Sequence, residues 1–151
     1  MRCALLALLL LCAVPCAQAA TCTVSATNVG FGGYNRLSAF DNASTGTVTV
    51  HCTTLLSLSL SYTVSLSAGS GTYTTRKLKS GSNTMNYNLY TDVLYAHIWG
   101  DGSGSTSTIT SSQLLTVLGL TNNHTVYGRI PAGQNVAAGS YADTITVTVD
   151  Y

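Results

Sequence analysis

Strict alternation of apolar and hydroxyl side chains is the feature that most constrains how this chain can fold. It governs three runs, at residues 47–53, 58–67 and 144–151. In each run apolar residues occupy every second position, and Ser or Thr fills most of the positions between them. A β-strand turns successive side chains to opposite faces of its sheet, so each run has one buried face and one solvated face. The pattern predicts an all-β chain.

Shorter candidate strands lie around and between these runs. They are residues 23–26, 73–78, 85–90, 95–99 and 125–130, with Gly-rich turns at 69–71, 81–83 and 100–104. Residues 113–120 could instead form a single helical turn, and their composition leaves this undecided. About seven short strands with turn signals between them predict an antiparallel β-sandwich.

Residues 1–19 have the pattern of a secretory signal peptide. Arg2 precedes an apolar run, which ends in the small-residue cleavage signal Ala17-Gln18-Ala19. We therefore expect cleavage before Ala20 and a mature domain at residues 20–151. This mature part has no apolar stretch long enough to span a bilayer.

Charged residues are rare, and this excludes several classes of function. The six basic residues include Arg2, so the mature chain keeps five, against five acidic residues that are all Asp. A nearly neutral chain has no electrostatic footprint for nucleic acid or for an anionic membrane. The three histidines, His51, His97 and His124, show no ligand spacing, and paired-carboxylate chemistry would need two of five scattered Asp residues. We expect no enzyme activity, no cofactor and no metal.

Two cysteines remain once the predicted signal peptide is removed. Three of the five lie within it, which leaves Cys22 and Cys52. An exported chain with two cysteines is typically cross-linked once. We therefore expect a disulfide between Cys22 and Cys52 that ties the first strand to the second.

Four short motifs distinguish this sequence from a generic β-sandwich. They are Phe31-Gly32-Gly33-Tyr34, Tyr87-Asn88-Leu89-Tyr90, Trp99-Gly100-Asp101-Gly102 and Gly128-Arg129-Ile130-Pro131-Ala132-Gly133-Gln134. Together with Cys22 and Cys52, their order and spacing resemble the spore coat protein U family, which includes the Csu-type pilins of the archaic chaperone–usher pathway. The resemblance covers residues 22–151, nearly all of the mature chain.

This resemblance implies an incomplete immunoglobulin-like β-sandwich that lacks its last strand and is completed by donor-strand complementation. In the family a periplasmic chaperone lends a strand to the open groove, and a neighbouring pilin subunit later replaces it at the outer-membrane usher. The terminal alternation agrees, because an unpaired last strand templates strand addition. The resemblance and this alternation together assign four residues to the donor-strand groove and the chaperone contact: Ile145, Val147, Val149 and Tyr151. A closed sandwich, with this strand paired on both sides, is the alternative.

The expected function is therefore that of a secreted structural subunit of a pilus or coat, which passes through the periplasm to the cell surface, the fimbrium or the extracellular space. A strand donor needs roughly ten alternating residues before its first cysteine, whereas Ala20 and Thr21 span under about 10 Å. We expect a subunit that accepts a strand but cannot donate one, at a pilus terminus such as the tip. A tip adhesin or lectin-like module that binds through its aromatic residues near 99–104, and a stand-alone secreted coat or matrix protein, are the alternatives.

Overall fold

The computed structural model describes residues 20–151, and the predicted signal peptide lies outside them. Eight strands and no helix are found in this part of the chain, which confirms the all-β prediction. The strands are β1 (Thr21–Ala26), β2 (Asn42–Thr53), β3 (Leu58–Leu66), β4 (Arg76–Ser80), β5 (Asn83–Tyr90), β6 (Ile109–Leu115), β7 (Leu120–Ile130) and β8 (Val147–Asp150). Over the same residues, no helix is available that could cross a membrane.

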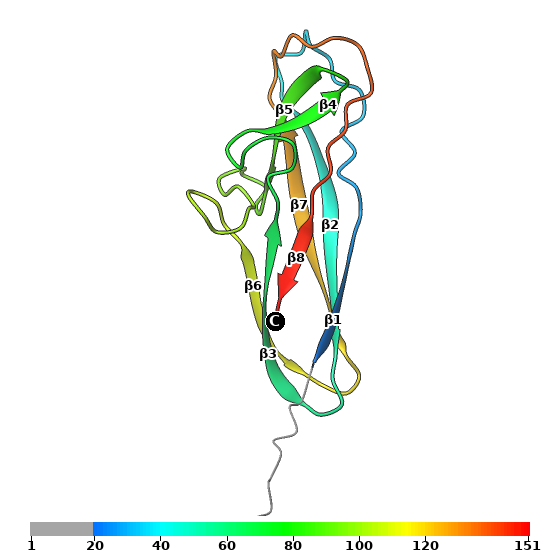
Figure 1. The fold of residues 1–151 in the computed structure, drawn as a ribbon, viewed down its shortest axis with the longest axis vertical. Helices are drawn as coiled ribbons and strands as arrows, with labels where there is room; N and C mark the ends of the chain where they lie inside the picture. The colour runs from blue at the N-terminus through cyan, green and yellow to red at the C-terminus, as the bar shows by residue number, and fades with distance from the viewer. Residues whose placement is uncertain (1–19) are drawn as a thin grey trace, which may run out of the picture.

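The strands form two antiparallel sheets that face each other across an elongated core (Figure 1). One sheet has five strands in the order β1-β2-β7-β5-β4, and the other has three in the order β6-β3-β8. The edge strands β1 and β8 therefore lie on one side of the sandwich, while β6 is the edge strand on the opposite side.

Alternation along β2 and β3 builds the interior of the sandwich, as the sequence predicted. Val48, Val50 and Cys52 of β2 are buried, and Tyr62 and Val64 of β3 are buried opposite them. The Ser and Thr residues between them are exposed or half-buried. Each fully buried apolar side chain of this size stabilises the fold by about 1.5–3 kcal/mol, so the apolar half of each strand fixes which face turns inward.

The disulfide joins Cys22 of β1 to Cys52 of β2, as predicted. The two residues are direct partners in the antiparallel pairing of these strands, with Cα atoms 4.1 Å apart. The bond therefore anchors the edge strand β1 to the sheet.

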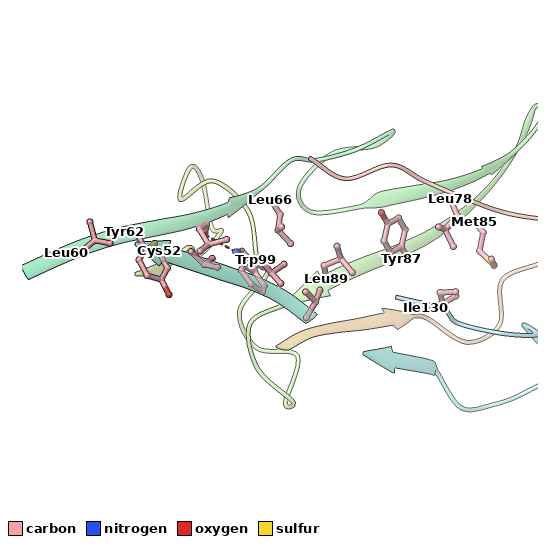
Figure 2. Packing of buried hydrophobic residues seen from close by; sticks show 14 of the residues in the cluster. Cys52, Leu60, Tyr62, Leu66, Leu78, Met85, Tyr87, Leu89, Trp99 and Ile130 are labelled. Atoms are coloured by element: carbon pink, nitrogen blue, oxygen red, sulfur yellow. Dashed lines mark hydrogen bonds between the residues drawn. The ribbon is translucent and has the colours of Figure 1, made fainter. Parts of the chain in front are cut away.

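The buried apolar side chains extend along the length of the sandwich, from Leu60 to Met85 (Figure 2). Trp99 and Arg76 are the largest fully buried side chains. The Trp99 ring is completely buried, and its Nε1 donates to the Val64 carbonyl at 3.0 Å. Arg76 is also fully buried, and burial lowers the pKa of its guanidinium. Its side chain donates to the carbonyls of Ser67 and Trp99 and to Asn88 Oδ1.

No carboxylate forms an ion pair with Arg76 within residues 20–151. Its charge is instead held by neutral acceptors from three separate segments. Charge-assisted hydrogen bonds of this kind are about twice as strong as neutral ones. Arg76 therefore ties the end of β3, the middle of β5 and the β5–β6 connection to one point.

Several predicted element boundaries were wrong. Residues 95–99 form no strand, because they lie in the β5–β6 connection, where Trp99 bonds through its backbone to Leu89 and Ser107 bonds to Ile98. Residues 113–120, which the sequence left undecided, end β6, pass through a turn and begin β7. The strand β6 itself was not predicted, because its centre, Thr110-Ser111-Ser112-Gln113, has no apolar alternation.

Candidate functional site

A groove of about 1290 Å³ opens between the two sheets on the side where β1 and β8 are the edge strands. One wall is the segment after β1, residues 26–37, and the other is the segment that leads into β8, residues 136–147. The floor is made of buried core side chains, among them Leu66, Met85 and Tyr87. The groove is therefore an opening directly onto the hydrophobic core.

Half-buried apolar side chains line both walls and point toward the core. Val29 and Phe31 belong to the first wall, and Val136, Ile145 and Val147 belong to the second. The Phe31 ring contacts the edge of Tyr87 with centroids 6.0 Å apart, and a Cβ atom at Gly128 would collide with it. Gly128 thus lets the first wall lie close against β7, which accounts for a glycine of the fourth sequence motif.

The strand β8 is paired along one edge alone within residues 20–151. It pairs with β3 from Thr63↔Asp150 to Leu66↔Val147, and no strand pairs with its other edge, which borders the groove. This arrangement differs from the closed sandwich that the sequence left open as an alternative. Backbone groups at such an edge are free to pair with an added strand.

Hydrogen bonds join the first wall of the groove to the segment that follows β7. The Tyr34 hydroxyl donates to the Pro131 carbonyl at 2.9 Å and accepts from the Gln134 backbone N–H at 2.8 Å. The Gln134 side chain in turn accepts from the backbone N–H of Asn86 and donates to its carbonyl. The Gly-Arg-Ile-Pro-Ala-Gly-Gln motif therefore links β5 to the first wall.

The lining of the groove includes a polar pair, the buried Tyr87 and the half-buried Asp143. The Tyr87 hydroxyl donates to Asp143 Oδ2 at 2.7 Å, and burial together with this carboxylate raises the pKa of Tyr87 well above its ordinary value. Asp143 Oδ1 accepts from the backbone N–H groups of Ser70 and Thr144. Gly69 adopts a φ of 62°, and a Cβ atom there would collide with the carboxylate. Asp143 therefore fixes the approach to β8.

The opposite side of the sandwich, next to β6, has a polar interior. Tyr62 Oη accepts from Asn122 Nδ2 at 2.7 Å and lies 3.0 Å from His124 Nε2. Gln113 Nε2 of β6 donates to Asn122 Oδ1 at 3.4 Å. Burial lowers the pKa of His124. These groups satisfy one another, so the interior next to β6 is polar where the groove is apolar.

The predicted groove residues take different positions. Ile145 and Val147 line the groove, and Val149 packs against the core further along β8. Tyr151 lies just beyond the strand and is 56% exposed. Residues 26–37 and the Tyr87–Asp143 pair were not assigned to the groove from the sequence, although the Phe31-Gly-Gly-Tyr34 motif marked the first wall.

The loop at 99–104, considered as an aromatic binding site, offers no exposed ring. Trp99 is buried, and residues 100–104 are Gly-Asp-Gly-Ser-Gly, which carry no aromatic side chain. Within the described part of the chain, no three His, Cys, Asp or Glu side chains gather closely enough to hold a metal ion. The groove is therefore the candidate functional site.

Comparison with known proteins identifies the family. The sequence matches the Spore Coat Protein U domain over residues 8–148. The chain belongs to this family. It is 30% identical to Protein U of Myxococcus xanthus over 133 residues, which cover 82% of this chain and 71% of that protein. The resemblance inferred from the motifs is confirmed, and so is the prediction of a non-enzymatic protein, because this is a family of structural subunits.

A solved structure shares the fold. It is the CsuC–CsuE chaperone–tip adhesion subunit pre-assembly complex from the archaic chaperone–usher Csu pili of Acinetobacter baumannii, matched with a TM-score of 0.60 and 24% identity. The match covers 88% of the present chain and 40% of that chain. The present chain thus spans less than half the length of that neighbour, and at this identity the likeness shows the fold alone.

Proposed function

We propose that this Spore Coat Protein U family member is an exported structural subunit of a chaperone–usher pilus or coat, assembled by strand addition. The observation that carries the proposal is the apolar groove along the unpaired edge of β8. An extended segment laid in this groove would pair with β8 through its backbone. Its alternate side chains would reach the core between Ile145 and Val147 on one side and Phe31 on the other.

This geometry supports the proposed partners, as does the fold's similarity to a chaperone–tip subunit complex. A periplasmic chaperone supplies the first strand, and a neighbouring subunit replaces it during assembly at an outer-membrane usher. The protein is then carried from the periplasm to the cell surface. The apolar walls explain why a chaperone is needed, because an apolar groove promotes aggregation until a strand fills the groove.

A position at the pilus tip stays a prediction. β1 begins at Thr21 and is paired with β2 along its length, so a segment that donates a strand to a neighbour would have to precede Thr21. N-terminal sequencing of the exported protein tests this point. An alternating extension before Thr21 would contradict the terminal placement.

Co-expression with an affinity-tagged periplasmic chaperone of the same host tests the proposed function. Val147→Asp places a charge on the half-buried, inward face of β8, and Thr148→Asp places the same charge on its exposed face. We expect the wild type and Thr148→Asp to co-purify with the chaperone and Val147→Asp to be lost. Equal retention of both variants, or a wild type that folds as a stable monomer without any chaperone, would instead favour a stand-alone coat or matrix protein.

A further inference from the structure

The second edge of the three-stranded sheet, β6, is also unpaired on one side. β6 pairs with β3 from Val64↔Ile109 to Leu58↔Leu115, and no other strand of the described residues borders it. It lies on the outer left edge of the molecule in Figure 1, away from the groove. Its free edge is therefore a separate surface from the proposed strand-acceptor site.

This edge lacks the features by which proteins normally prevent edge-to-edge pairing. Lys and Pro residues, bulges or covering segments usually protect exposed edge strands. β4 carries Lys77 and Lys79, and its edge is partly covered through the bridge between Lys79 and Ala142. β6 contains no charged residue, no Pro and no Gly, and the whole stretch 102–128 carries no charge.

Exposed apolar side chains gather at the end of β6. Leu114 is 68% exposed on the strand itself, and Val117 and Leu118 in the following turn are 62% and 90% exposed. Leu55 and Leu56, in the turn before β3, are exposed at the same end of the molecule, because Leu58 pairs with Leu115. Leaving several large apolar side chains in water is unfavourable.

We propose that the free edge of β6 pairs antiparallel with β6 of a second copy and so joins subunits side by side. A twofold axis at Ser112, the central residue of the strand, gives complete overlap of the seven residues. This register sets Thr110 of each copy opposite Leu114 of the other. It brings no like charges together, and it covers the exposed Leu114 side chain with the methyl group of Thr110.

A second copy is favoured over other occupants by the chemistry of the edge. A charged peptide or an anionic surface would find no complementary charge on β6. An identical strand offers the same uncharged hydroxyl and apolar positions in a self-complementary order. The contact leaves the groove free, so pairing through β6 could join subunits laterally whether or not the groove is filled.

Cysteine cross-linking in the exported full chain tests both the edge and the register, since the native cysteines are already paired with each other. Ser112→Cys should form a disulfide-linked dimer under mild oxidation. Thr110→Cys and Leu114→Cys should each cross-link poorly alone and efficiently when mixed. Leu94→Cys, 82% exposed in the β5–β6 connection, is the control for random collision.

Two outcomes would overturn the proposal. One is Ser112→Cys cross-linking no faster than Leu94→Cys at the highest concentration at which the chain stays soluble. The other is cross-linking of Thr148→Cys on β8 in place of Ser112→Cys, which would show that copies meet through the groove edge. In the chain without engineered cysteines, Leu114→Lys should weaken self-association about tenfold, and Leu94→Lys should leave it unchanged.

Discussion

The two open sides of this sandwich differ in what their interiors contain. On the side of β1 and β8, the walls of the groove are apolar, and the lining residues Phe31 and Val147 are half-buried. On the side of β6, Tyr62, Asn122 and His124 satisfy one another by hydrogen bonds. Filling an apolar opening removes apolar surface from water and lowers the free energy, whereas a satisfied polar interior has no such gain to make. The first side, the groove side, is open onto the core, whereas the interior of the second, the β6 side, is satisfied by its own hydrogen bonds.

The largest expected effect comes from removing the buried hydrogen bonds of Arg76. Arg76→Met leaves the carbonyls of Ser67 and Trp99 and the Asn88 amide oxygen buried without their donor. We expect a loss of about 3–5 kcal/mol in the free energy of unfolding, measured by urea denaturation. Lys79→Met, exposed on the same strand, is the control. A loss below about 1 kcal/mol would show that Arg76 does not organise the core.

The second largest effect on stability should come from the disulfide, because it secures the edge strand β1 on the groove side. It closes a loop with a sequence separation of 30, for which the chain-entropy relation gives about 3.5 kcal/mol. The double variant Cys22→Ala/Cys52→Ala should lose about this much stability and bind the chaperone more weakly. Thermal unfolding of the oxidised and reduced wild type provides an independent measure. Unchanged stability in both experiments would mean that β1 is held without the bond.

A smaller effect on stability is expected from a change on the β6 side. Tyr62→Phe keeps the buried ring but removes the oxygen that accepts from Asn122 and bonds to His124. We expect a loss of about 1 kcal/mol with chaperone binding unchanged. Tyr151→Phe, at an exposed hydroxyl, should be neutral. Loss of chaperone binding in Tyr62→Phe would contradict the separation of the two sides.

The smallest effect is a pH dependence that arises on the same side. Burial lowers the pKa of His124, so the folded chain favours the neutral imidazole, while the unfolded chain takes up a proton near pH 6.5. The contribution is fully present above about pH 6.5 and is lost as the pH falls below it toward the folded-state pKa. Denaturation curves from about pH 7.5 to pH 5 should show this decline. It should diminish in His124→Gln but persist in His51→Gln, where the side chain lies on the exposed face of β2.

The alternation of apolar and hydroxyl residues predicted the strands that have one buried face and one solvent-exposed face. It placed β2, β3 and the inward side chains of β8, and counting cysteines placed the disulfide. It missed β6, because that edge strand borders a polar interior and carries no apolar alternation. The groove walls could not be derived from local pattern either. They depend on contacts between residues distant in sequence, such as Tyr34 with Gln134 and Tyr87 with Asp143.

The burial of Arg76 was the other feature that could not be predicted from the sequence. Nothing local distinguishes it from Lys77 and Lys79, which are half-buried and exposed on the same strand. Its role depends on acceptors from β5, from the end of β3 and from the β5–β6 connection. These converge only in the folded chain.

The central claim is that the groove side is completed by a strand from another protein. Amide hydrogen exchange of the mature chain, free and bound to its chaperone, tests it most directly. The account predicts new protection in β8 and in residues 26–37 on binding, with exchange in β6 unchanged. Amides on the open edge of β8 that are equally protected in the free chain, or protection that appears in β6 instead, would contradict it.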